Sequence, residues 1–73
     1  MMTITQPIDH LQICLAPSAI GQVRPVYDYP GPVPPGANSL VVMLDGYGEF
    51  FAVETAPVLL RELDRLRRKQ VSN

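Results

Sequence analysis

Proline placement restricts the folding of this chain more than any other feature of its sequence. Six of the eight prolines fall within residues 16–38. Because proline fixes the backbone angle φ and lacks an N–H donor, it interrupts both helices and central strands. We therefore expect residues 16–38 to form a proline-rich loop, in which residues 22–29 could make a short edge strand that tolerates Pro25. A loop of this length is either a surface crossover or a partner-binding segment.

The segment after this loop, residues 39–70, has the pattern of a hairpin followed by a helix. Residues 40–44 are a continuous apolar run, which is typical of a buried strand, and Asp45 with Gly46 favours a tight turn into a second strand. Alternate residues of paired strands share one face of a sheet. Of the two faces, we expect the C-terminal helix to cover the one that carries Leu40, Val42, Leu44, Phe51 and Val53.

The helix is predicted to begin after Thr55, a residue type that is favourable at the N-cap. Pro57 is tolerated in the first helical turn, where its missing N–H would have no partner in any case. Apolar residues spaced three and four apart then form one stripe along the helix. That stripe comprises Ala56, Leu59, Leu60, Leu63 and Leu66.

The N-terminal part of the chain adds one more predicted strand. Residues 8–15 alternate between apolar and polar side chains, which is the period of a half-buried strand. Residues 1–7 are expected to form a flexible arm, because chain termini are mobile unless paired, although residues 3–5 could add to a sheet edge. Residues 1–73 therefore predict a single small domain of the α+β class, a small antiparallel sheet of three to four strands with one C-terminal helix packed on it.

Few side chains in this sequence can support catalysis. The chain has one histidine, His10, and one cysteine, Cys14, which in a strand would share a face but lie too far apart to hold one metal ion. The carboxylates of Asp45, Glu49 and Glu54 lie on or beside one hairpin, and paired acids alone are common at protein surfaces. We therefore expect a protein that is not an enzyme, with no catalytic residue, no metal site and no cofactor.

Charge is distributed unevenly along the chain. Residues 1–60 contain one basic and five acidic residues, whereas residues 61–73 contain five basic and two acidic residues. An acidic body with a basic helix end can orient the molecule on a charged partner. The single cysteine, the absence of a secretory pattern at the N-terminus and the lack of an apolar run of about 20 residues predict a cytoplasmic protein without membrane contact.

Aromatic and basic side chains indicate the predicted partner surface. Tyrosine is enriched in the cores of protein interfaces, where its ring is buried and its hydroxyl stays hydrated. The residues predicted to bind a protein partner are Arg24, Tyr27, Tyr29, Arg65, Arg67 and Arg68. Two alternatives stay open: self-association through the face around Phe50, or nucleic-acid binding by the basic helix. The nucleic-acid contacts would then come from Arg61, Arg65, Arg67 and Arg68.

Residues 41–70, VVMLDGYGEFFAVETAPVLLRELDRLRRKQ, combine a small sheet with a basic helix in a chain of only 73 residues. In size, layout and lack of catalytic motifs, the chain resembles the very small phage-encoded regulators that bind bacterial RNA polymerase. The resemblance implies a non-catalytic protein in the host cytoplasm that docks on host RNA polymerase, inhibits transcription initiation and promotes antitermination. It carries no individual residue role over to this chain.

Overall fold

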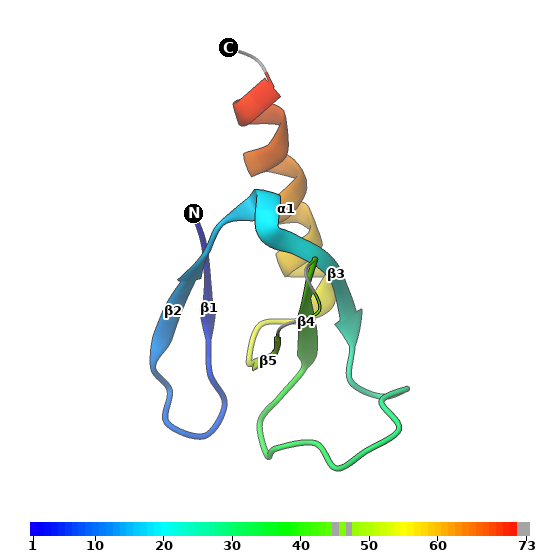
Figure 1. The fold of residues 1–73 in the computed structure, drawn as a ribbon. Helices are drawn as coiled ribbons and strands as arrows, with labels where there is room; N and C mark the ends of the chain where they lie inside the picture. Colours follow the sequence, from blue (N-terminus) through cyan, green and yellow to red (C-terminus); the bar gives the residue numbers. More distant parts are fainter. Residues whose placement is uncertain (45, 47, 72–73) are drawn as a thin grey trace.

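The computed structural model describes residues 1–44, 46 and 48–71 of the chain. The predicted α+β class is confirmed, with the strands divided between two small antiparallel sheets and one helix at the C-terminal end (Figure 1). The first sheet has the order β1-β2 and the second has the order β3-β4-β5. The elements are β1 (Met2–Thr5), β2 (Gln12–Leu15), the 3-10 helix η1 (Pro17–Ala19), β3 (Ile20–Pro25), β4 (Ser39–Met43), β5 (Glu49–Ala52) and α1 (Ala56–Val71).

The N-terminal residues form a buried strand, so the prediction that residues 1–7 are a flexible arm is wrong. Strand β1 pairs antiparallel with β2, and the side chains of Met2 and Ile4 are completely buried. The physical reason lies in the alternation of β1, which places Met2 and Ile4 on the core side and Thr3 on the solvent side. Pro7 follows the strand in the connecting loop, where its missing N–H interrupts no pairing.

The proline-rich segment is ordered over its first part, so the predicted loop over residues 16–38 is confined to residues 26–38. Pro17 starts η1, and Pro25 ends β3 at the edge of the three-stranded sheet. Both positions tolerate proline, because neither the first turn of a helix nor the outer side of an edge strand needs the N–H. The edge strand predicted over residues 22–29 exists, but it is shifted to Ile20–Pro25.

The sheet turns the opposite face toward the helix from the one predicted. Val41 and Ala52 are buried in the cluster that also contains Leu59 of α1, whereas Leu44 is largely exposed. The predicted face is instead covered in part by Tyr29, whose ring meets that of Phe51 edge to face at 5.3 Å between centroids. Small side chains at Val41 and Ala52 let the helix approach the sheet, and the aromatic pair shields the other side. The turn residues Asp45 and Tyr47 lie outside the described residues.

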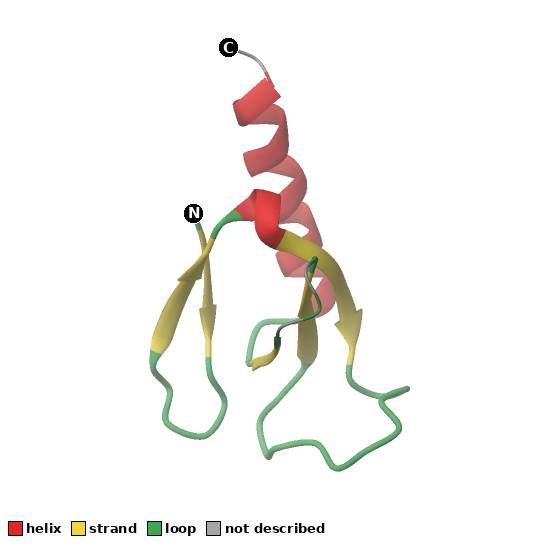
Figure 2. Cartoon of the chain, viewed as in Figure 1, coloured by secondary structure: helices red, strands yellow, loops and turns green. Residues whose placement is uncertain are grey.

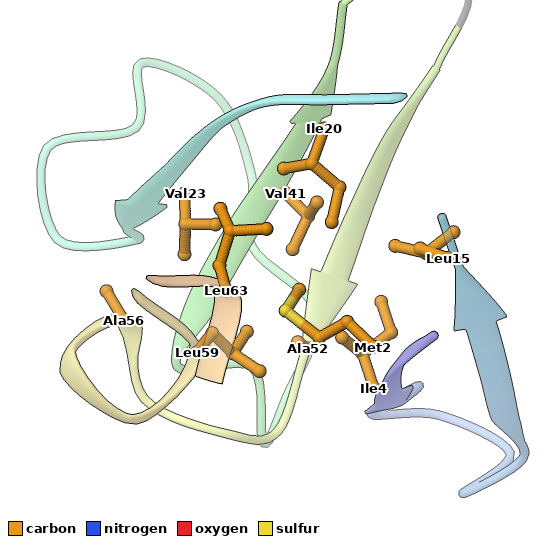
Figure 3. Packing of buried hydrophobic residues seen from close by; sticks show 10 residues of the cluster. All are labelled: Met2, Ile4, Leu15, Ile20, Val23, Val41, Ala52, Ala56, Leu59 and Leu63. Carbon is orange, nitrogen blue, oxygen red and sulfur yellow. The ribbon is translucent and has the colours of Figure 1, made fainter. Parts of the chain in front are cut away.

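Strands β1 and β3 and helix α1 supply most of the core, which Figure 3 shows at close range. The helix begins at Ala56, directly after Thr55, as predicted, and buries Ala56, Leu59 and Leu63. Leu60 was expected in the same stripe but is 47% exposed, because it lies about 100° around the helix from the buried Leu59. The core residues are Met2, Ile4, Leu15, Ile20, Val23, Val41, Ala52, Ala56, Leu59 and Leu63.

Thr5 and Glu54 join the two sheets at one end. The backbone N–H of Thr5 donates to Oε1 of Glu54 at 2.9 Å, and the Thr5 hydroxyl donates to Oε2 at 2.8 Å. The backbone N–H of Val53 donates to the Thr5 carbonyl at 2.9 Å, and the buried Ser39 hydroxyl donates to the Glu54 carbonyl at 2.7 Å. Burial alone raises the pKa of the Glu54 carboxyl, but the hydrogen bonds from Thr5 and from the Glu54 backbone outweigh it, and its net pKa is lowered.

Replacing this carboxylate is expected to weaken the fold in a pH-dependent way. The Glu54→Gln variant should lose about 1–2 kcal/mol of unfolding free energy at neutral pH, a hydrogen-bond value reduced for partial exposure. Because the folded pKa is lowered, the contribution of Glu54 is fully present above its usual value of 4.5 and is lost as pH falls through the folded pKa. Urea unfolding of both proteins at decreasing pH should show the difference between them shrinking.

The matched control is Glu49→Gln, which changes an exposed glutamate outside the contact with Thr5. This variant should unfold at the same urea concentration as the unmodified chain. A Glu54→Gln difference that stays constant into acid would contradict the ionised role of Glu54 at the sheet junction.

Candidate protein-binding surface

The structure separates the six predicted partner-binding residues into two groups. The first group belongs to β3 and the loop after it, and the second lies near the C-terminal end of α1. The molecule is elongated, with extents of 41 × 22 × 20 Å, and Figure 1 shows the loop after β3 and the C-terminal end of α1 at opposite ends. Arg24, Tyr27 and Tyr29 therefore do not form one site with Arg65, Arg67 and Arg68.

Within the first group, the three side chains have different environments. The Arg24 guanidinium pairs with Asp28 at 3.4 Å, and both side chains are about half exposed. Tyr29 packs against Phe51 and so has a structural role. The side chain of Tyr27 is 87% exposed, which makes it the most available aromatic ring of the described surface. Tyr27 is the member of this group with the strongest claim to a partner contact.

The arginines of the second group are engaged within the molecule. Arg65 donates to both oxygens of Glu62, and this hydrogen bond lowers the pKa of the Glu62 carboxyl and raises that of Arg65. Arg68 forms an ion pair with Asp64 at 2.8 Å. Pairing of this kind partly neutralises the helix end and weakens its attraction for phosphate groups.

Arg67 links the helix to the start of the second sheet. Its Nη2 atom donates to the carbonyl of Ile20 at 2.8 Å and lies 3.5 Å from the carbonyl of Pro17. Both carbonyls belong to the turn from η1 into β3, so the guanidinium ties that turn to α1. Arg67, which was predicted to contact a partner, thus makes hydrogen bonds within the chain.

Replacing Arg67 is therefore expected to affect stability more than replacing its neighbour. Arg67→Ala should lower the unfolding free energy by about 1–2 kcal/mol, because it removes charge-assisted hydrogen bonds to two backbone carbonyls. Arg68→Ala removes only an exposed ion pair and should change it by less than about 0.5 kcal/mol. Urea unfolding followed by circular dichroism measures both. Equal effects would show that the Arg67 contact does not support the fold.

Two loops at the other end of the molecule carry exposed apolar side chains. We call this surface the loop end and define it as residues 6–11 and 26–38, the two loops that Figure 2 shows side by side, opposite the C-terminal end of the helix. The loops approach each other closely, since a Cβ added to Gly36 would lie 3.8 Å from the Cβ of Pro7. The exposed apolar residues of the loop end are Ile8, Leu11, Tyr27 and Val33.

Sequence patterns did not identify three of these four residues. Ile8 and Leu11 were assigned to a strand over residues 8–15, but the strand starts at Gln12 and both side chains face solvent. Val33 was not among the residues predicted to bind a partner. The available signal was the position of Ile8 beside Pro7 and Asp9, which favours a turn over a strand.

Phe50 offers little exposed surface for the predicted alternative of self-association. Phe50 is partly buried and packs against the core cluster beneath the helix. For comparison, the side chain of Ile8 is 77% exposed. A second molecule would therefore meet more apolar surface at the loop end than at Phe50.

The part of the chain that the structure describes contains no group of three His, Cys, Asp or Glu side chains placed to hold a metal ion. Within residues 1–44, 46 and 48–71, no helix has both the length and the apolar character needed to cross a membrane. Comparisons of the chain with protein families, with characterised proteins and with solved structures found no match. The chemistry of the described surface is therefore the basis for assigning a function.

Proposed function

We propose that this chain is a non-catalytic regulator that binds a partner protein through the loop end. The observation that carries the proposal is that Ile8, Leu11, Tyr27 and Val33 are all exposed and belong to two loops that approach each other at Pro7 and Gly36. Exposed apolar side chains on adjoining loops offer a partner protein contact area that water solvates poorly. Tyrosine at such a site contributes a large contact area and a hydroxyl that can stay hydrated.

The prolines of the loop end favour binding for a separate reason. Residues 26–38 include Pro30, Pro32, Pro34 and Pro35. Each proline removes backbone freedom from the unbound loop, so less entropy is lost when the loop docks. The pair of Arg24 and Asp28 beside Tyr27 adds polar groups of the kind that surround an interface core.

Bacterial RNA polymerase is the partner that we assign to this surface. The assignment rests on the resemblance of the whole chain, in size, layout and lack of catalytic motifs, to small phage-encoded regulators, together with the loop-end surface available for docking. On this proposal the chain acts in the host bacterial cytoplasm, where its binding to polymerase inhibits initiation and promotes antitermination. Nucleic acid would be contacted only within the complex, because Arg65, Arg67 and Arg68 are engaged within the chain.

The test is retention of purified bacterial RNA polymerase on the immobilised chain, followed by transcription from a template with one promoter and one terminator. We expect polymerase to be retained, promoter-initiated transcripts to fall and read-through to rise. Ile8→Asp should abolish the retention of polymerase and both changes in transcription, because it introduces a charge among the apolar residues of the loop end.

Val58→Asp is the matched control for this variant. Val58 is an exposed aliphatic residue in the first turn of α1, where a negative charge is tolerated by the helix dipole. It should retain polymerase as well as the unmodified chain does. No retention of polymerase by the unmodified chain, or equal loss with both variants, would refute the proposed docking.

A further inference from the structure

A groove of about 380 Å³ lies along the outer edge of β5. Its walls include Pro7 and Ile8 from the first loop, Pro34 from the second, and both Phe50 and Phe51. Consecutive residues of a strand point to opposite faces of a sheet, so a groove that touches both phenylalanines must follow the edge of the strand. The loop end therefore borders the open side of β5.

That edge offers backbone groups to an added strand. Strand β5 pairs with β4 on one side, and the Val53 N–H just beyond β5 points the other way, to the Thr5 carbonyl. With a period of two, the N–H and C=O of Phe51 point to the same outer side as Val53. Among the described residues, β4 is the only strand that pairs with β5, so Phe51 can bond an extended chain placed in the groove.

The side chains along the groove define the chemistry of that chain. Asp9 and Glu49 contribute two carboxylates, and no lysine or arginine is among the described residues that line the groove. Pro7, Ile8 and Phe51 together supply the apolar part of the groove wall. A complementary segment is extended, carries apolar side chains, and has a lysine or arginine within reach of the carboxylates.

We infer that this groove binds an extended, basic segment of the partner protein by adding it as a strand to the edge of β5. The inference rests on the proposed function, because it names the part of the partner that the loop end recognises. Backbone hydrogen bonds to Phe51 fix the register of the added segment. The carboxylates of Asp9 and Glu49 then select segments with basic residues.

The test uses a synthetic peptide, Lys-Val-Thr-Val-Thr-Val-Lys, titrated into the ¹⁵N-labelled chain and followed by NMR. We expect amide shifts centred on Glu49 and Phe51, and slower hydrogen exchange at Phe51. The matched control peptide has the same side chains but carries an N-methyl group on every residue after the first, which removes the N–H donors of both edges. It should bind about tenfold more weakly, since the peptide can no longer donate to the Phe51 carbonyl and its N-methyl groups crowd the edge of β5.

A pair of charge variants tests the selection of basic segments. Glu49→Gln should weaken binding of the unmodified peptide and reduce its dependence on salt, whereas Glu62→Gln, the same change on the helix, should leave both unchanged. Equal binding of the two peptides, shifts that avoid β5, or no binding at millimolar peptide would overturn the inference. The inference would also be overturned if, before any peptide is added, the chain tumbled more slowly at high concentration and the Phe51 amide were protected from exchange. A second copy of the chain would then occupy the edge of β5.

The outcome is separable from that of the proposed function. If polymerase is retained in an Ile8-dependent way but the peptide ignores β5, the strand-addition inference is wrong and docking through the loop end stands. If the peptide binds at β5 but polymerase is not retained, the groove is confirmed and polymerase is excluded as the partner.

Discussion

Replacing Ile4 with alanine is expected to lower the free energy of unfolding by about 2–5 kcal/mol. Ile4 is fully buried at the centre of β1, and Figure 3 shows it within the core beside Met2 and Ala52. Truncation would leave a cavity in a domain whose total stability is on the order of 5 kcal/mol. Urea unfolding followed by circular dichroism should show a large shift of the midpoint, or a chain that is unfolded in buffer.

Ile8→Ala provides the matched control, because it makes the same chemical change at an exposed position. It should alter the unfolding free energy by no more than about 0.5 kcal/mol. An Ile4→Ala variant as stable as Ile8→Ala would mean that residues 1–7 are a flexible arm after all, and that β1 is not part of the core.

The second large effect is expected for Leu59 in the helix. Leu59 is almost completely buried against the sheet, so Leu59→Ala should also lose about 2–5 kcal/mol of unfolding free energy. Loss of this anchor should detach α1 from Val41 and Ala52, and the helical signal should decrease together with the tertiary structure. Thermal unfolding monitored in the far and near ultraviolet measures both changes.

Leu60→Ala is the control for this prediction, since Leu60 was expected in the same apolar stripe but is half exposed. Its loss should be less than about 1 kcal/mol, because little apolar area is uncovered. Equal losses for the two variants would indicate that the helix packs on the sheet with the face predicted from the apolar stripe alone.

Local sequence signals were sufficient to predict the strands and the helix of the second half of the chain, but not the face of the sheet that the helix covers. Strands β4 and β5 and helix α1 could be predicted because the apolar run of residues 40–44 and the helix start after Thr55 are signals within a few residues. These local signals do not depend on contacts with residues far away in the sequence. The α+β class followed directly from these strands and this helix.

The first half depended on contacts that sequence patterns do not record. Strand β1 is ordered because β2 pairs with it and Glu54 binds Thr5, and Glu54 lies 49 residues away along the chain. The buried face of β4 could not be chosen from alternation alone, since both of its faces are apolar. The Tyr29 ring packs against Phe51 and so covers part of the face opposite the helix.

The candidate site was predicted only in part for the same reason. Tyr27 could be identified from its residue type and its place in a proline-rich loop. The approach of this loop to residues 6–11, where Gly36 lies beside Pro7, depends on tertiary structure. The separation of Arg24 from Arg68 likewise follows from the direction in which α1 leaves the sheet.

The central claim is that the loop end, rather than the basic helix end, binds the partner. Biolayer interferometry with immobilised bacterial core RNA polymerase tests it directly, by comparing Tyr27→Ala with Arg68→Ala. We expect Tyr27→Ala to weaken binding at least about tenfold, as truncation of an interface tyrosine commonly does, and Arg68→Ala to bind like the unmodified chain. Strong loss with Arg68→Ala and none with Tyr27→Ala would contradict the account and assign recognition to the helix.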